Sequence, residues 1–507
     1  MTTLETPPAY ERLVELLREK KILNSCGALL GWDEQTYMPP GGGEHRANQL
    51  ALLAGLTHER ATTPELGDLL EQLKEIEATA DPLSVMAVNI RDARRDYERA
   101  TQLPRKLVEE MTREISLAQQ KWVEARRQAD FSLFRKSLEN IIRLKREEAK
   151  ILSREGDCLY DALLDEYEPG MKAEQVQALF DPLREGVIQL LQQITDSPVE
   201  PKTEILKRSY PTSRQHEIGQ AAAAQIGFDF QRGRLDTTAH PFCSDIGPGD
   251  VRLTTRYFEN FFNSGFFGIL HEAGHGIYEQ GLNADQFGLA MGDSVSLGIH
   301  ESQSLLWENF VGRSRPFWTH FFPKVQGLYP ESLGDVTLDD FYTAINDVRP
   351  SYIRVEADEL TYNLHIMLRF ELEQKLISGE LEAADVPEIW NSRFTEYLGI
   401  TPENDAQGCL QDIHWSAGLL GYFPTYALGK MYSAQFFKAA QTAIPDLTDQ
   451  ISNGEFRELK TWLNENIHAR GKLYQARDLV KVVTGNELSE KPLLEALGAK
   501  YGEIYGF

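Results

Sequence analysis

Apolar residues recur every three or four positions along most of this chain from Tyr10 onward. The pattern is clearest from Leu107 to Arg127 and from Phe131 to Arg154, where charged residues fill the positions between the apolar ones. This spacing is typical of amphipathic helices that pack one face on a common core. The chain is therefore predicted to be mainly α-helical.

One segment departs from the helical period. From Val251 to Phe258, β-branched and aromatic residues alternate with Arg252, Thr254 and Arg256, as in a half-exposed strand. The pattern predicts a small β-sheet within the helical protein. Two interpretations stay open: a sheet edge that pairs with an extended peptide, and a simple hairpin.

The chain has 507 residues but no Ser-, Gly- or Pro-rich linker long enough to separate independent units. We therefore expect one domain over residues 1–507. Within it, N-terminal helices would occupy 1–230, an active-site half 231–430 and C-terminal helices 431–507.

Charge and cysteine content exclude several classes of protein. The net charge of −25 repels nucleic acid and anionic membrane surfaces. The four cysteines lie far apart without a CxxC pair, so neither a disulfide framework nor a thiolate zinc site is indicated. The N-terminal stretch has no apolar signal-like run, and no later stretch resembles a membrane span. We expect a cytoplasmic protein without nucleic-acid or membrane partners.

The most informative motif is H-E-x-x-H, formed by His271, Glu272 and His275. Imidazoles four residues apart lie on one helix face and can bind one metal ion. A bound zinc ion lowers the pKa of its water, and Glu272 can take the remaining proton as the hydroxide attacks an amide carbonyl. The apolar neighbours predict a buried helix, although Gly274 and Gly276 weaken it locally.

A third metal ligand must come from elsewhere in the chain. The metzincin pattern is excluded, and Glu279 is about 12 Å along the helix from His271, too far to share one ion with it. Glu301, on a second apolar helical pattern, can complete a His2Glu site that leaves a position for water. Asp293 and Glu308 remain alternatives to Glu301. His300 is expected to line the cleft, because adjacent residues on a helix point in different directions.

With these residues in place, the chain resembles the thermostable metallocarboxypeptidases of the carboxypeptidase Taq type. Six motifs of that family occur intact and in order, and the opening LLGWDEQTYMPPGGGEHRANQL is also similar. The motifs are HPF at His240–Phe242, DVRLT at Asp250–Thr254, HEAGH at His271–His275, HESQ at His300–Gln303, IRVEAD at Ile353–Asp358 and GCLQDIHW at Gly408–Trp415.

The resemblance implies a single large helical, saddle-like subunit with a deep groove and, usually, a homodimer. It also implies removal of C-terminal residues from peptides with Zn²⁺ or Co²⁺. Composition and spacing alone indicate only a helical H-E-x-x-H metallohydrolase.

An enzyme of this kind must bind a free carboxylate, which a guanidinium does with two parallel charged hydrogen bonds. Arg354 is the preferred candidate, with Arg349 and Arg252 as alternatives. Arg252 and Thr254 are further expected to contact the substrate backbone. His240 and Asp250 are expected to hold the strand and the metal helix in register, with Asp250 accepting a hydrogen bond from a ligand imidazole.

The tetrahedral intermediate needs a hydrogen-bond donor for its developing oxyanion. The segment HWSAGLLGYFPTY offers His414, Tyr422 and Tyr426, and Tyr422 is favoured because the pattern is similar to that of related helical metallopeptidases. Gln411, Asp412 and His414 are expected to form the hydrogen-bond network of the groove, with Asp412 orienting a histidine.

The favoured function is a zinc carboxypeptidase with broad specificity that acts through a metal-bound water activated by Glu272. The second hypothesis is a helical zinc oligoendopeptidase with the same metal chemistry. The third is a binding or chaperone-like protein whose metal is structural, which an open His2Glu site disfavours.

Overall fold

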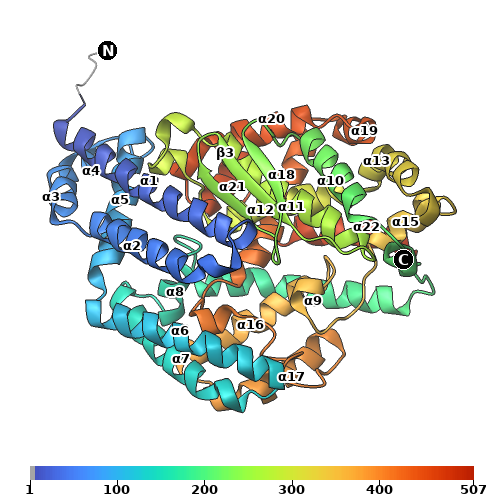
Figure 1. The fold of residues 1–507 in the computed structure, drawn as a ribbon, viewed down its shortest axis with the longest axis horizontal. Coiled ribbons are helices and arrows are strands. Elements are labelled where there is room, and N and C mark those ends of the chain that lie inside the picture. The colour runs from blue at the N-terminus through green and yellow to red at the C-terminus, as the bar shows by residue number, and fades with distance from the viewer. Residues whose placement is uncertain (1–5) are drawn as a thin grey trace.

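The computed structural model describes residues 6–507, so the first five residues of the N-terminal stretch lie outside it. Helices dominate the described residues, as predicted (Figure 1). In the first half of the chain they are α1 (Pro8–Thr36), α2 (Gly43–Ala61), α3 (Pro64–Gln72), α4 (Lys74–Thr79), α5 (Val85–Gln102), α6 (Arg105–Gln128), α7 (Ser132–Leu152), α8 (Leu159–Leu164), α9 (Ala173–Asp196) and α10 (Thr212–Ile226).

The second half alternates long helices with short helical turns. The longer elements are α11 (Phe262–Gly281), α12 (Leu297–Leu305), the π-helical turn η5 (Leu306–Gly312), α13 (Arg315–Leu328), α14 (Pro330–Leu333), α15 (Leu338–Ile345), α16 (Tyr362–Ser378), α17 (Val386–Leu398), α18 (Pro424–Ala443), α19 (Leu447–Asn453), α20 (Arg457–Asn466), α21 (Ala476–Thr484) and α22 (Lys491–Tyr505). The short 3-10 turn η6 (Arg354–Glu356) lies within the motif IRVEAD, and η8 (His414–Ala417) begins in the motif GCLQDIHW and ends two residues beyond it.

The predicted strand exists, and it is part of a three-stranded sheet. Strands β1 (Gly233–Thr237), β2 (Cys243–Gly247) and β3 (Asp250–Thr255) form a sheet in the order β1-β3-β2. The β2–β3 pair is an antiparallel hairpin, and β1 joins β3 in parallel. The edge interpretation is therefore wrong for β3, because both of its sides are already paired.

The hydrophobic core has two parts. The larger cluster takes residues from Ala118 to Tyr505 and therefore includes all three predicted segments of the chain. A smaller cluster joins α1, α3 and α5 through Tyr10, Leu13, Leu66 and Ile90, among others. The proposed division of the chain at residues 230 and 430 stays a prediction.

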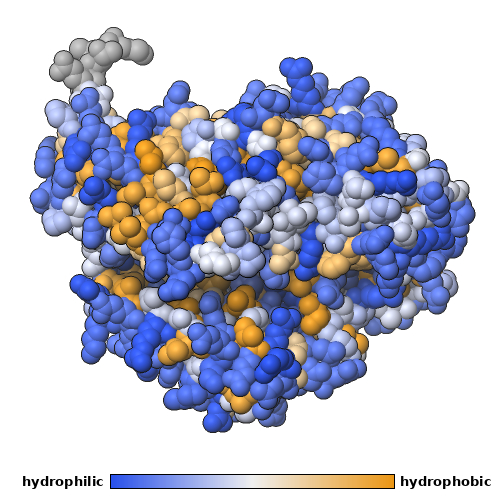
Figure 2. All heavy atoms as spheres, in the orientation of Figure 1, coloured by the Kyte–Doolittle hydropathy of each residue, from blue (hydrophilic) through white to orange (hydrophobic). Residues whose placement is uncertain are grey.

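Helices α1 to α5 lie together on one side of the sheet, at the left of Figure 1. Helix α2 buries none of its residues, and apolar side chains of α1 and α2 such as Leu29, Leu52 and Leu56 are exposed. Figure 2 shows apolar surface over this part of the molecule. The same view shows the surface hollowed between these upper elements and the lower group that contains α6, α7, α16 and α17. Among the described residues, no helix has both the length and the apolar character needed to cross a membrane.

Candidate active site

Helix α11 places the H-E-x-x-H motif in the centre of the molecule. Its first turns bury Phe262, Phe266 and Phe267 in an aromatic cluster, which fixes the helix although it contains several glycines. A Cβ atom at Gly274 would lie 2.6 Å from backbone atoms of α12. The glycine that weakens α11 locally thus allows two helix backbones to approach closely.

Three ligand atoms converge where α11 faces α12. His271, His275 and Glu301 each offer one atom, and these atoms all lie within 4.8 Å of one another. Glu301 Oε2 is 3.7 Å from His271 Nε2 and 3.4 Å from His275 Nε2. Ligand atoms bound to a tetrahedral zinc ion at 2.0–2.2 Å are about 3.3–3.6 Å apart. The donor set and its spacing therefore fit a zinc ion with only small side-chain adjustment.

The electrostatics of the three groups suit a divalent cation. Burial opposes ionisation of Glu301, but the facing His271 charge and the His275 hydrogen bond outweigh it and lower its pKa to about 2. Burial lowers the pKa of His275 to about 4, which gives the neutral imidazole that a metal requires. Burial also opposes protonation of His271, but Glu301 and Glu308 raise its pKa to about 10, so metal binding would displace a proton there.

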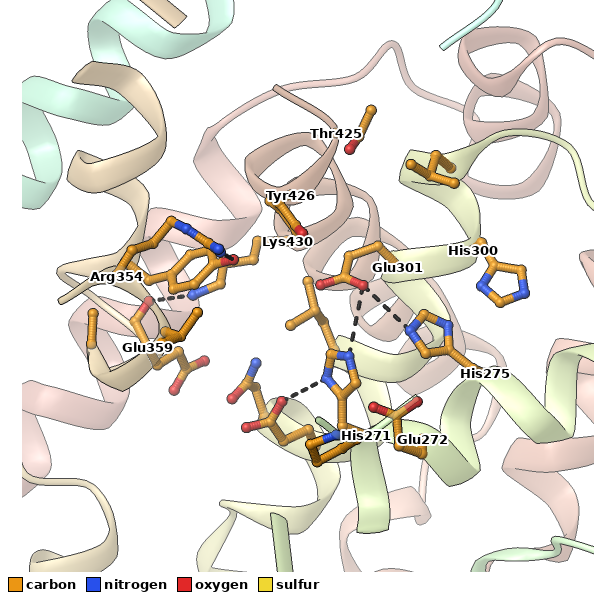
Figure 3. Close-up of a pocket in the computed structure, with 18 of the residues that line it drawn as sticks. His271, Glu272, His275, His300, Glu301, Arg354, Glu359, Thr425, Tyr426 and Lys430 are labelled. Carbon is orange, nitrogen blue, oxygen red and sulfur yellow. Dashed lines mark hydrogen bonds and ion pairs between the residues drawn. The ribbon is translucent and has the colours of Figure 1, made fainter. Parts of the chain in front are cut away.

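Glu272 lies beside the ligands with its carboxylate at the cavity (Figure 3). Burial is the main cause that raises its pKa to about 7, opposed by the charge of His271. A carboxylate whose pKa is near neutrality can both accept and return a proton at pH 7.

A second carboxylate orients the first histidine from the other side of its ring. Glu308, in the π-helical turn η5, is 2.9 Å from His271 Nδ1 through Oε2 and accepts from Arg313 Nη2 at 3.2 Å through Oε1. Such a carboxylate fixes the tautomer and direction of a metal-bound imidazole. Glu308 therefore supports His271 and is not among the converging ligands, so it does not replace Glu301 as the third ligand. Asp293, the other alternative, pairs with Lys21 and Lys472.

The ligands form one wall of a cavity of about 630 Å³. Figure 3 shows His271, His275, Glu272 and Glu301 on one side and Arg354, Glu359 and Lys430 on the other, with Tyr426 between them. The lining of the cavity also includes Tyr422, Tyr362 and His300, and the exposed apolar side chains of Leu297 and Val355.

A family model and known proteins match this chain over almost its whole length. The model of the carboxypeptidase Taq (M32) metallopeptidase family matches residues 12–501. The chain belongs to this family.

Relatives of this M32 chain include thermostable carboxypeptidase 1 of Thermus thermophilus, 48% identical with 98% of this chain and 99% of that protein covered. Carboxypeptidase 1 of Bacillus subtilis is 39% identical, with 98% and 99% covered. The crystal structure of an M32 carboxypeptidase from Deinococcus radiodurans superimposes with a TM-score of 0.95 at 39% identity, covering 99% of this chain and 100% of that one. The chain is thus a metallocarboxypeptidase, a peptide hydrolase for which a divalent metal is expected.

Several predicted site residues of the M32 chain line the cavity together. Arg354, Tyr422 and His300 do so, whereas Arg349 and Arg252 do not. His300 Nε2 is 2.6 Å from Glu279, and its ring stacks on His275 with centroids 4.5 Å apart. Glu279 therefore pairs with His300, which agrees with the expectation that Glu279 cannot bind the same metal ion as His271.

The Gln411–Asp412 pair supports Arg354 instead of a histidine. Asp412 accepts from Arg354 Nε and Nη2 at 3.0 and 2.9 Å and from Arg369 Nε at 2.7 Å. Gln411 accepts from the Arg354 backbone N–H at 2.8 Å. His414 Nδ1 is 4.0 Å from Asp412, too long for a hydrogen bond, so Asp412 does not orient it as expected.

His414 nevertheless lies beside the favoured tyrosine. Its ring centroid is 5.4 Å from that of Tyr422, and its Nε2 is 3.5 Å from the Tyr426 hydroxyl. Neither nitrogen of His414 reaches the cavity lining, whereas both tyrosines do. Burial lowers the pKa of His414 to about 4, opposed by Asp412, so the imidazole is neutral at pH 7.

The structure places the predicted β3 residues Asp250, Arg252 and Thr254 outside the cavity lining. Arg252 donates to both oxygens of Asp250, at 2.8 and 2.7 Å, and stacks on Trp32. Asp250 therefore pairs with Arg252 and not with a ligand imidazole, and Thr254 hydrogen-bonds the backbone of Phe242. His240 is exposed, although the next residues of its motif, Pro241 and Phe242, do line the cavity.

Two polar lining residues, Tyr362 and Lys430, had no motif to identify them. Tyr362 accepts from Arg354 Nη1 at 2.6 Å, and Lys430 Nζ lies 4.6 Å from the centre of the Tyr362 ring. Lys430 is four residues after Tyr426 on α18, one helical turn away, and this spacing was the only signal available in the sequence.

Proposed function

We propose that this chain is a zinc-dependent carboxypeptidase in which His271, His275 and Glu301 hold the ion. The main support is the convergence of these three ligands with Glu272 on one wall of a cavity whose opposite wall is cationic. A bound Zn²⁺ would polarise the scissile carbonyl and make water a nucleophile at neutral pH, and Co²⁺ is proposed as a substitute.

Each further step belongs to a residue of the chain. Glu272 takes the proton of the attacking water and returns it to the leaving amine, as its pKa near neutrality permits. Tyr422 donates a hydrogen bond from its hydroxyl to the developing oxyanion, and His414 packs beside the Tyr422 ring. Arg354 binds the terminal carboxylate of the peptide, with its guanidinium fixed by Asp412 and Tyr362.

The proposal also covers the specificity, the assembly and the location of the protein. Broad side-chain specificity agrees with a cavity that mixes charged, aromatic and aliphatic lining residues. The homodimer and the cytoplasmic location stay predictions that rest on the family resemblance and on the sequence. Sedimentation velocity of the purified protein tests the first of them.

The experiment is mass spectrometry of an unblocked peptide and its C-terminal amide after incubation with the zinc-loaded protein. We expect a ladder of C-terminal losses from the free acid alone. Glu272→Gln should retain its metal, because Glu272 is not a ligand, and lose at least about 100-fold in kcat. Internal fragments from both peptides would instead support the oligoendopeptidase.

A further inference from the structure

Lys430 is a buried cation on the cavity wall opposite the candidate metal ligands. The residue is 4% exposed, and its ammonium lies 4.6 Å from the centre of the Tyr362 ring. Figure 3 shows Lys430 beside Arg354 and Glu359. Its hydrogen bond goes to the backbone carbonyl of Glu359, 2.8 Å away. An ammonium has three donors, so two N–H groups of Lys430 have no protein acceptor among the described residues.

The carboxylates around Lys430 already have other partners. Glu359 forms an ion pair with Lys500 at 2.6 Å, and Asp358 accepts from the backbone and hydroxyl of Thr361. Glu308 binds His271 and Arg313. Within residues 6–507, no carboxylate oxygen lies within 4.0 Å of Lys430 Nζ. A buried charge without a partner is costly, so a wall that retains one is suited to an anion from outside the protein.

Arg354 differs from Lys430 in this respect. Its Nε and Nη2 atoms are bound to Asp412, and Nη1 is bound to Tyr362. The charge of Arg354 is therefore largely compensated by Asp412. The N–H groups that remain can orient a bound anion but add little net charge to attract it. Lys430, whose Nζ is 4.6 Å from the centre of the same tyrosine ring, provides a charge that has no ion pair.

We propose that Lys430 binds the C-terminal carboxylate of the peptide substrate together with Arg354. This inference rests on the proposed carboxypeptidase function and assigns its carboxylate subsite to two cations that both contact Tyr362. A carboxylate has two oxygens and about four acceptor positions, enough for an ammonium and a guanidinium together. The ammonium then gains an acceptor for N–H groups that have none in the protein.

The test compares Lys430→Met with the unmodified enzyme on a free-acid peptide and on its C-terminal amide. Methionine keeps most of the side-chain volume and removes the charge. We expect kcat/KM for the free acid to fall about 30- to 100-fold, mainly through KM, because a hydrogen bond to a charged group is lost. The amide, which has no anion, should change less than about threefold, so the preference for the free acid collapses.

Two further variants separate loss of the contact from general damage. Lys430→Arg keeps a cation and should recover a large part of the free-acid preference. Lys438→Met removes a cation of the same helix that is paired with Glu495 and does not line the cavity, so it should leave the preference unchanged. Thermal unfolding of each variant checks that the fold is retained.

A binding measurement distinguishes failure of this proposal from failure of the proposed function. In the Glu272→Gln background, calorimetry compares binding of an N-acyl amino acid with binding of its amide, without any need for turnover. We expect the protein with Lys430 to bind the acid at least about 30-fold more tightly than the amide, and Lys430→Met to lose most of that difference, with the remainder due to Arg354. An unchanged acid preference in Lys430→Met would overturn the proposal, and so would an effect confined to peptides that end in Glu compared with Gln. Absence of a C-terminal ladder from the unmodified enzyme would overturn the function instead.

Discussion

The clearest test of how the metal site is built is Glu308→Gln. The Glu308 carboxylate is 2.9 Å from His271 Nδ1, so in the metal-bound protein it would accept the hydrogen bond of the ring and hold Nε2 toward the ion. Glutamine keeps the shape but removes the charge and can turn its NH2 group toward the ring. Loss of such a carboxylate typically weakens metal binding about 10- to 100-fold, or about 1.4–2.7 kcal/mol.

The chain contains a matched control for this change. Glu279 forms an equivalent carboxylate–imidazole pair with His300 at 2.6 Å, but His300 is not one of the three converging ligands. Competition with a chromophoric chelator would measure Zn²⁺ affinity, and circular dichroism would check the fold. Glu308 does not orient His271 for the metal if Glu308→Gln binds Zn²⁺ as tightly as the unmodified protein, or if Glu279→Gln weakens binding by as much.

Two other changes test the packing against Glu301 and the titration of a buried carboxyl group, Glu168. Gly429→Ala places a Cβ 2.9 Å from Glu301 Cγ and should weaken metal binding about tenfold in the chelator assay, whereas Gly327→Ala, with open space around it, should not. Burial raises the pKa of Glu168, which accepts from two hydroxyls and from the Gly298 N–H, to about 7. Since the folded state holds this proton more tightly than the unfolded state, stability contributed by Glu168 falls by about 3 kcal/mol at most as pH rises from about 4.5 to 7. Denaturant unfolding at pH 5 and pH 8 should show a smaller loss for Glu168→Gln, and an equal loss would contradict the assignment.

Much of the fold could be predicted because the helical period is local. The segments from Leu107 to Arg127 and from Phe131 to Arg154 correspond to α6 and α7 within two residues at each end. The central place of β3 could not be predicted, because its parallel partner β1 is a short strand with little alternation. Which strand lies at an edge depends on pairing between segments, and spacing within one segment does not record it.

The site shows the same limit. The spacing of His271 and His275 shows that they share a helix face, and the convergence of Glu301 with them agrees with the predicted return of the chain. The pairing of Asp412 with two arginines could not be found in this way, because nothing in the sequence specifies which cation meets which carboxylate after folding. Lys430 was missed for the same reason, since a lysine on an apolar helix has no motif to distinguish it.

The glycines at the helix contacts connect these observations. At Gly274 the backbone of α11 meets α12, and at Gly429 the backbone of α18 meets the Glu301 side chain, so α12 is held between two close contacts. Lys430 directly follows Gly429 on the same rigid helix. The distance between the metal ligands and Lys430 is thus set by the packing of α18 against α12 and not by a mobile loop. A fixed distance of this kind would restrict cleavage to a set number of residues from the C-terminus, which is the property that separates an exopeptidase from an endopeptidase with the same metal ligands.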